Sequence, residues 1–344
     1  MTTPQTVPGL NGHLILSADQ YTARDRRAWL KARRQGLGAS ETATILGLNK
    51  YQTPLSIWMD KTATEDPEER DAGPKARWGN ILEHTVAVQT SKEYLAPLGL
   101  KIAPTPGLLA HEEHAWMLAT IDRLIVPRAS KDRERVESLL EVKTTGEWNY
   151  KQNWLDGIPP ATYQVQVQQQ LAVTGLPYAY VACLVDGYDL KPPVRIDRDE
   201  EVIGQLIELG GAWWSQYVEG GQRPPVTFAD ASLLSTLYPG DASLPHILAT
   251  DESPVLTALG QFVFHRDQEK AHADAKDRAK FEVQKALGDA LAVQDTQGRV
   301  LATWKPQTST GLDTKALKAK HPDLAAEFSK TSTSRTFLVK DLDA

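Results

Sequence analysis

The segment WMLATIDRLIV (residues 116–126), followed by VESLLEVKTT (136–145), decides the fold of this chain. Both runs are rich in β-branched and large apolar residues, and the polar segment PRASKDRER joins them, so we expect a β-hairpin with a long loop. Alternation along the second strand puts Glu141 and Lys143 on one face and Val142 on the other. An acid and a lysine inside an apolar run are expected to be partly buried, and a buried charge without a partner is costly.

Two further acids lie where they can join Glu141. Asp122 belongs to the first strand of the hairpin, and Glu83 belongs to a segment (75–94) whose apolar positions have helical spacing. Carboxylates from two neighbouring strands and a helix can converge on a hard cation such as Mg²⁺ or Mn²⁺. A lysine two residues beyond a metal ligand can place its ammonium group beside an attacking water and a scissile phosphate. This set therefore indicates phosphodiester hydrolysis.

Each of these residues also has an ordinary structural explanation that involves no metal. Glu83 could be a solvated acid, Asp122 and Arg123 could form an ion pair at the end of a strand, and Glu141 and Lys143 could belong to an exposed charged stripe on the second strand. The apolar surroundings of Glu141 favour convergence on a metal over these alternatives. His84 is not expected to join Glu83 at one metal, because adjacent helix residues diverge by about 100°.

The remaining pattern predicts an α/β arrangement. Residues 161–175 favour a helix closed by Gly175, residues 179–187 and 193–198 favour strands, and residues 199–220 favour a helix. Toward the N-terminus, residues 22–34 form an arginine-rich helix that either is simply solvated or guides a DNA backbone. A short helix follows, which Ser40 could cap.

A length of 344 residues suggests more than one domain. After Pro225 the sequence becomes irregular, with few helix signals over residues 226–254. We therefore predict one domain over residues 13–225, a linker over 226–254 and a small α+β domain over 255–344. In the last of these, a long charged helix (255–290) precedes two strands (290–295 and 299–305), and SRTFLVKD (334–341) is expected to close a small sheet.

Composition excludes some classes of function. The net charge of −6, from 38 basic and 44 acidic residues, excludes binding to nucleic acid through strong overall positive charge, but permits a local basic path to an acidic centre. The single cysteine, Cys183, excludes an intrachain disulfide framework. No apolar run approaches the roughly 18 residues of a membrane helix, and no signal segment is evident. We expect a cytoplasmic protein without a membrane partner.

Four short sequence blocks are informative when they are taken together and in their order along the chain: RRQGLGASE (33–41), WGNILE (78–83), ATIDRLIV with LLEVKTT (119–145), and YQVQVQQQLAVTG (163–175). Together they resemble the PD-(D/E)xK nuclease superfamily and, within it, the YqaJ-type viral recombinase family of phage lambda exonuclease-like proteins. The resemblance implies a restriction-endonuclease-like α/β core, with a mixed central sheet flanked by helices, to which the small C-terminal α+β appendage is added.

The resemblance also implies the roles of individual residues. It makes Glu83, Asp122 and Glu141 metal ligands, Lys143 the catalytic lysine and Gln166 a residue that orders the site. It assigns a 5′-phosphate site to Arg33, Ser40 and Thr120, and a guanidinium with hydroxyl donors suits a phosphate monoester. This sequence departs from the family pattern at Ile121, which replaces the proline, and at Asn149, where a second basic phosphate contact is expected and Lys151 is nearby.

The implied function is Mg²⁺-dependent DNA exonuclease activity, with Mn²⁺ as a substitute. It would run 5′→3′ on linear double-stranded DNA and leave 3′ single strands for phage-type homologous recombination. The implied partners are DNA ends, a single-strand annealing protein and further copies of the chain in a trimeric ring, in a phage- or prophage-encoded protein. Two alternatives stay open: a non-processive or structure-specific endonuclease, and a catalytically inactive DNA-end-binding protein.

Overall fold

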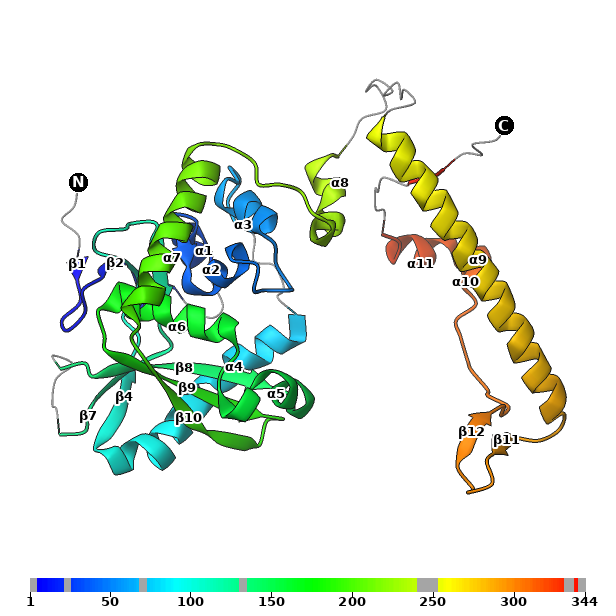
Figure 1. Ribbon diagram of the computed structural model, residues 1–344, viewed down its shortest axis with the longest axis horizontal. Coiled ribbons are helices and arrows are strands. Elements are labelled where there is room, and N and C mark those ends of the chain that lie inside the picture. Colours follow the sequence, from blue (N-terminus) through cyan, green and yellow to red (C-terminus); the bar gives the residue numbers. More distant parts are fainter. Residues whose placement is uncertain are drawn as a thin grey trace. The chain divides into compact units, whose positions relative to one another are not determined.

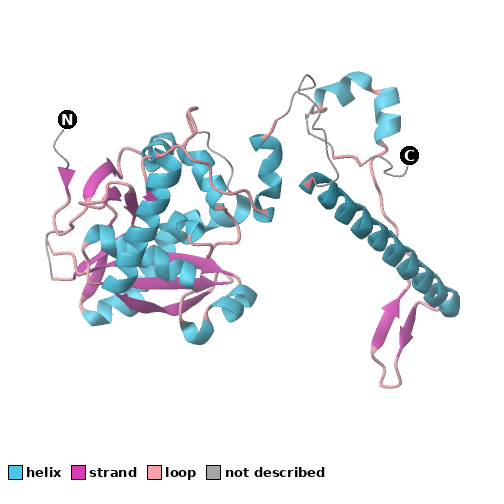
Figure 2. Ribbon diagram, turned by 45° about the horizontal axis from the view of Figure 1, so that its top comes forward, coloured by secondary structure: helices cyan, strands magenta, loops and turns pink. Residues whose placement is uncertain are grey.

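The computed structural model describes residues 5–21, 26–67, 73–129, 135–239, 253–330 and 337–339. The chain divides into two compact units, Met1–Leu233 and Leu234–Ala344 (Figure 1). In the first unit, ten strands form two five-stranded sheets with helices packed against them (Figure 2). The predicted mixed α/β class is confirmed, although the strands are divided between two sheets instead of forming one central sheet.

The first sheet is largely antiparallel. Its spatial order is β1 (Gln5–Thr6), β2 (His13–Ser17), β5 (Gly107–Ala110), β6 (Met117–Thr120) and β3 (Leu37–Gly38). Only the last pair is parallel, with Leu37 opposite Met117. Strand β3 leads directly into α2 (Ala39–Ile45), so this edge positions the start of that helix.

The second sheet is mixed and carries the predicted hairpin. Its order is β10 (Asp189–Asp197), β9 (Tyr178–Val185), β8 (Ser138–Thr145), β7 (Arg123–Pro127) and β4 (Leu100–Pro104). Strands β7 and β8 are antiparallel, which confirms the hairpin, and β8 runs parallel to β9. Strand β8 is therefore central and is flanked on both sides.

The segment 116–126, predicted as one strand, is divided between the two sheets. Strand β6 ends at Thr120 in the first sheet and β7 begins at Arg123 in the second. Ile121 is fully buried between them, and the carboxylate of Asp122 accepts a hydrogen bond from the main-chain N–H of Val142 at 2.8 Å. The chain crosses from one sheet to the other at the predicted metal ligand.

Two helices cover opposite faces of the second sheet. Helix α6 (Ala161–Thr174) packs Val167 and Leu171 into a core that includes Leu139. Helix α4 (Gly73–Thr90) packs Val86 into a separate core with Leu140. Because neighbouring strand residues point to opposite faces, Glu141 shares the α6 face with Leu139.

Five other helices complete the first unit: α1 (Arg27–Arg33), α3 (Pro54–Lys61), α5 (Glu147–Asn153), α7 (Glu200–Trp213) and the already named α2. Short π- or 3₁₀-helical turns occupy Ser91–Leu95, Ala96–Leu98, Leu155–Gly157, Trp214–Glu219 and Phe228–Leu233. The arginine-rich helix is shorter than predicted, and Arg24 lies outside the described residues. Ser40 does not cap α2: the N-cap is Gly38, and Ser40 is the second helical residue.

The second unit contains α8 (Leu234–Leu237), α9 (Pro254–Leu287), β11 (Ala292–Gln294), β12 (Val300–Thr303), α10 (Thr314–Lys320) and α11 (Pro322–Glu327). Strands β11 and β12 pair antiparallel, as predicted. The expected closing strand 334–341 lies mostly outside the described residues, and its described part, Phe337–Val339, is not in a strand. Among the helices of the described ranges, none combines the length and apolar character needed to cross a bilayer.

Candidate active site

Strand β8 presents Glu141 and Lys143 side by side at the centre of the second sheet. Glu141 is 3% exposed. The ammonium nitrogen of Lys143 lies 2.6 Å from Oε1 of Glu141 and donates to Oε1 of Gln166 at 2.9 Å. The predicted alternation of this strand therefore places both charges on one face, where α6 meets them.

Asp122 adds a second carboxylate from the crossing between the sheets. Burial raises the pKa of Asp122 well above its usual range, and the negative charges of Glu141 and Glu83 raise it further, against the opposing effect of Lys143. An excess of negative charge at one point favours either protonation or a bound cation. The site is therefore electrostatically suited to a metal ion.

Lys143 is held in its protonated form. Burial alone lowers its pKa, but the carboxylates of Glu141 and Asp122 outweigh burial, so the pKa of Lys143 lies above its ordinary value. Its ammonium nitrogen also lies 4.6 Å from the ring centroid of Tyr163 on α6. A cation held in this way can stabilise negative charge on a phosphate, but it is a poor general base at neutral pH.

Glu83 reaches the site from α4. A cleft of about 400 Å³ is lined by Glu83, Asp122, Glu141 and Lys143, and on the α4 side by Lys75 and Asn80. The Glu83 carboxylate pairs with Arg123 at 2.8 Å, and a nitrogen of the same guanidinium lies 3.3 Å from Nδ1 of His84. His84 is exposed on α4.

Helix α6 supplies two amides to Glu141. Nε2 of Gln166 donates to Oε1 at 2.6 Å, and Nε2 of Gln170 donates to Oε2 at 2.7 Å. The sequence pointed to Gln166 but not to Gln170. The feature that could have identified Gln170 is its separation of four residues from Gln166, which puts both amides on one helix face.

The donor set fits a divalent cation with oxygen ligands. Within the described ranges, no group of three His, Cys, Asp or Glu side chains forms a ready-made cage. Mg²⁺, however, needs only one or two carboxylates, because it keeps several waters and takes oxygens from substrate phosphates. Asp122 and Glu141 supply two carboxylates, and Glu83 lines the same cleft.

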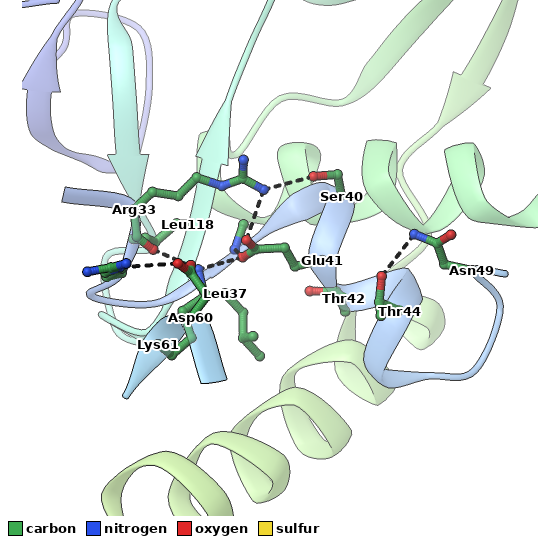
Figure 3. Close-up of polar contacts among 12 residues, drawn as sticks. Arg33, Leu37, Ser40, Glu41, Thr42, Thr44, Asn49, Asp60, Lys61 and Leu118 are labelled. Carbon is green, nitrogen blue, oxygen red and sulfur yellow. Dashed lines mark hydrogen bonds and ion pairs between the residues drawn. The ribbon is translucent and has the colours of Figure 1, made fainter. Parts of the chain in front are cut away.

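A second charged group, which we call the arginine cluster, consists of Arg33, Ser40, Glu41 and Lys61 (Figure 3). Nη2 of Arg33 donates to Oγ of Ser40 at 3.0 Å and lies 3.1 Å from Oε1 of Glu41. Lys61 lies 2.8 Å from the other oxygen of Glu41. Two of the three residues predicted to bind a terminal phosphate, Arg33 and Ser40, are thus brought together.

Glu41 and Lys61 were not foreseen, and they form the buried base of the arginine cluster. Burial raises the pKa of Glu41, but the charges of Arg33 and Lys61 outweigh it, so this pKa lies below its usual range. The Lys61 side chain is fully buried and also donates to the main-chain oxygen of Arg33 at 2.9 Å. Glu41 therefore stays ionised and fixes the direction of the Arg33 guanidinium.

The other residues predicted to contact phosphate have different partners in the structure. Thr120 ends β6, and its main-chain oxygen accepts a hydrogen bond from Gln170 at 3.0 Å. Asn149, on α5, donates to Oγ1 of Thr145 at 2.7 Å. Lys151 pairs with Glu147 on the exposed face of the same helix, at 2.6 Å.

The chain resembles known proteins over most of its length. The YqaJ-like viral recombinase domain model matches residues 28–177. Protein YqaJ of Bacillus subtilis (strain 168) is 32% identical over 337 residues, which cover 95% of this chain and 98% of that protein.

Two solved structures are also similar. The alkaline exonuclease LHK-Exo from Laribacter hongkongensis has a TM-score of 0.44 and 20% identity, covering 56% of this chain and 93% of that one. A phage-related exonuclease from Haemophilus somnus 129PT has a TM-score of 0.36 and 14% identity, covering 54% of this chain and 96% of that one. The identity and coverage of the Bacillus protein, together with the domain match, show that the chain belongs to the YqaJ-like viral recombinase family.

Proposed function

We propose that this protein is a metal-dependent deoxyribonuclease that acts as an exonuclease on linear double-stranded DNA. The observation that carries the proposal is the pair of carboxylates, Asp122 and the buried Glu141, that line one cleft, with the protonated amine of Lys143 in contact with Glu141. Membership in a viral recombinase family supports DNA as the substrate.

The residues that would hold Mg²⁺, or Mn²⁺ in its place, are Asp122 and Glu141, with Glu83 at the edge of the cleft. A bound divalent cation supplies Lewis-acid activation of water and of the scissile phosphate. The chain itself supplies a fixed carboxylate at Glu141, because Gln166 and Gln170 hold its two oxygens separately. Because Glu141 is already held in place, less conformational freedom is lost when the metal and substrate reach the reactive geometry.

Lys143 would stabilise the negative charge that develops on the phosphate. Its ammonium group is already oriented by Glu141, Gln166 and the ring of Tyr163, so it needs no rearrangement during the reaction. Its raised pKa keeps it charged at the pH of the cell. A water ordered beside Gln166 would be the attacking group.

The finer assignment is a 5′→3′ direction that starts at a terminal phosphate. Arg33 and Ser40 would bind that phosphate, and Thr120, at the end of β6, is the third residue proposed for this role. The exposed part of Arg33 offers guanidinium N–H groups beyond those that contact Ser40 and Glu41. Such an enzyme would leave 3′ single strands for an annealing protein in phage-type recombination, in the cytoplasm, as a single chain or as a ring of three.

The test uses linear duplex DNA, with one strand labelled at its 3′ end, beside a covalently closed circle of the same sequence. With Mg²⁺ and 5′-phosphorylated ends, we expect the labelled strand to shorten progressively from its 5′ end while the circle stays intact. Cutting of the circle would replace the proposal with an endonuclease on the same fold. DNA binding without cleavage in either Mg²⁺ or Mn²⁺ would leave an end-binding protein.

A further inference from the structure

Gln170 joins the two sheets of the first unit through a single side-chain nitrogen. The residue is fully buried on α6, one turn beyond Gln166. Its Nε2 donates to Oε2 of Glu141 at 2.7 Å and to the main-chain oxygen of Thr120 at 3.0 Å. A primary amide has two N–H groups, so both are used. One acceptor belongs to the second sheet and the other ends a strand of the first.

The chemistry of these two acceptors fixes the orientation of the amide. A carboxylate oxygen and a carbonyl oxygen accept hydrogen bonds and donate none, so a reversed amide would place Oε1 of Gln170 against both. In the orientation present, Oε1 is buried and has no hydrogen-bond partner among the described residues. A buried acceptor left without a hydrogen bond is destabilising. An unpaired buried acceptor beside the charged site indicates that Gln170 has a role other than stabilising the fold.

Gln170 and Gln166 hold different oxygens of the same carboxylate. Gln166 bonds Oε1 of Glu141 and also Lys143, so its contacts stay within the charged site. Gln170 bonds Oε2 and extends the network away from the site, to Thr120. Of the two amides, it is Gln170 that bonds both the end of β6 and Glu141.

The strand that Gln170 contacts is connected to the arginine cluster. Strand β6 pairs in parallel with β3, which runs directly into the helix that bears Ser40 and Glu41. The neighbouring Gln169 donates to the main-chain oxygens of Leu37 and Leu118, at 2.8 and 2.9 Å, and so fastens both strands to α6. Helix α6 thus holds the edge that carries the arginine cluster and the carboxylate that faces the cleft.

We propose that Gln170 is a positioning residue that couples phosphate binding at the arginine cluster to the orientation of Glu141. This inference rests on the proposed function. With the coupling intact, a terminal 5′-phosphate speeds hydrolysis as well as improving binding. Without it, the arginine cluster still binds the phosphate, but the rate no longer responds to it.

The test compares Gln170→Met with Gln168→Met in the full chain. Methionine keeps the length of glutamine and removes its donors. Gln168 is the matched control, because it is also buried on α6 but bonds Asp197 and Asp199, far along the chain from the site residues. Each protein is assayed on the same duplex with a 5′-phosphate or a 5′-hydroxyl. The initial rate is measured with Mg²⁺, and the dissociation constant is measured in EDTA.

For the wild type and Gln168→Met, we expect faster cleavage of phosphorylated ends. For Gln170→Met, we expect the rate on phosphorylated ends to fall about 10- to 100-fold, the range typical of residues that orient a metal ligand. The ratio of the two rates should fall to within about twofold of one, while the ratio of the two dissociation constants stays at the wild-type value. Thermal melting checks folding, and Gln170→Asn, too short to reach both acceptors, replaces Gln170→Met if that variant does not fold.

An equal loss of rate on both kinds of end would overturn the coupling and leave Gln170 a structural residue. An unchanged ratio of rates, or a wild type that cleaves both ends equally, would also overturn it while the proposed nuclease function stands. A wild type that cleaves neither end with Mg²⁺ or Mn²⁺ would instead overturn the proposed function, and the coupling with it.

Discussion

The ammonium nitrogen of Lys143 lies 2.6 Å from the carboxylate of Glu141, two residues away on the same strand. Alternation puts both side chains on one face of β8, and α6 closes over them with Gln166. The contact keeps Lys143 protonated and keeps one oxygen of Glu141 paired, so the pair carries no net charge. The charge of Asp122 is then left to attract a cation.

Asp122→Asn should stabilise the metal-free protein at neutral pH. The raised pKa of Asp122 means that the folded state holds this proton more tightly than the unfolded chain does. Stability should therefore fall as the pH rises from the unfolded value, about 3.9, through the raised folded value. Asparagine abolishes that loss and still accepts from the N–H of Val142. We expect the melting temperature in EDTA to rise by about 2–4 °C, or roughly 1 kcal/mol.

The same variant should lose its response to Mg²⁺. Melting curves recorded with and without the metal should show stabilisation of the wild type and little change in Asp122→Asn, because one of two carboxylate ligands is gone. A drop in the EDTA melting temperature of the variant would contradict the repulsion that we assign to Asp122.

The pH dependence of hydrolysis should depend on the metal concentration. Protons and metal compete for Asp122, so activity should fall as the pH falls through the raised pKa of this carboxyl. More Mg²⁺ should move that acid limb to lower pH. On the alkaline side, the raised pKa of Lys143 predicts no loss of activity from this residue below about pH 10. Rates between pH 5 and 9 at two Mg²⁺ concentrations test this, and an acid limb that ignores Mg²⁺ would argue against it.

Arg33→Lys should weaken the preference for phosphorylated ends. Lysine keeps the charge but cannot contact Ser40, Glu41 and a phosphate with one planar group. We expect the dissociation constant for a 5′-phosphorylated duplex to rise about tenfold, with little change for a 5′-hydroxyl duplex. The adjacent Arg34 is the control, because it pairs with Asp60 at 3.2 Å. An equal effect of Arg34→Lys would show that general positive charge, and not the arginine cluster, binds the end.

Lys61→Met should destabilise the first unit strongly. It removes one of the two cations that neutralise the buried carboxylate of Glu41, and breaking such a pair costs about 3–5 kcal/mol. Lys31→Met is the matched control: its ion pair with Asp66 is exposed, and such pairs contribute about 0–1 kcal/mol. Urea unfolding measures both. Equal midpoints for the two variants would show that the buried pair contributes no more than a surface pair.

Much of the fold follows from local sequence patterns. Period-two alternation predicted β8 and placed Glu141 and Lys143 on one face, and Gly175 ends α6 in a left-handed conformation, as the sequence suggested. The division of residues 116–126 between two sheets could not be predicted. Apolar residues lie on both sides of residues 120–123, as in one continuous strand, and no local signal says that the two halves belong to different sheets.

The supporting residues of the site were harder to find than its charged centre. Acids and a lysine within apolar runs are conspicuous, so Asp122, Glu141 and Lys143 stand out in the sequence. Gln170 lies in a run of identical residues whose contacts depend on what α6 packs against. The partner of Glu41 lies 20 residues away on another helix, so only tertiary packing brings Lys61 to it.

The central claim is that Asp122, Glu141 and Lys143 form a metal-dependent phosphodiesterase centre. Its most direct test is the rate of nucleotide release from a 5′-phosphorylated linear duplex, with Mg²⁺, for the wild type and for Lys143→Ala, with Lys191→Ala as the control. Lys191 is on the same sheet and pairs with Asp189 at 2.5 Å. We predict release by the wild type and by Lys191→Ala, none in EDTA, and a loss of at least about 100-fold in a folded Lys143→Ala protein. Equal release by Lys143→Ala and the wild type would contradict the account.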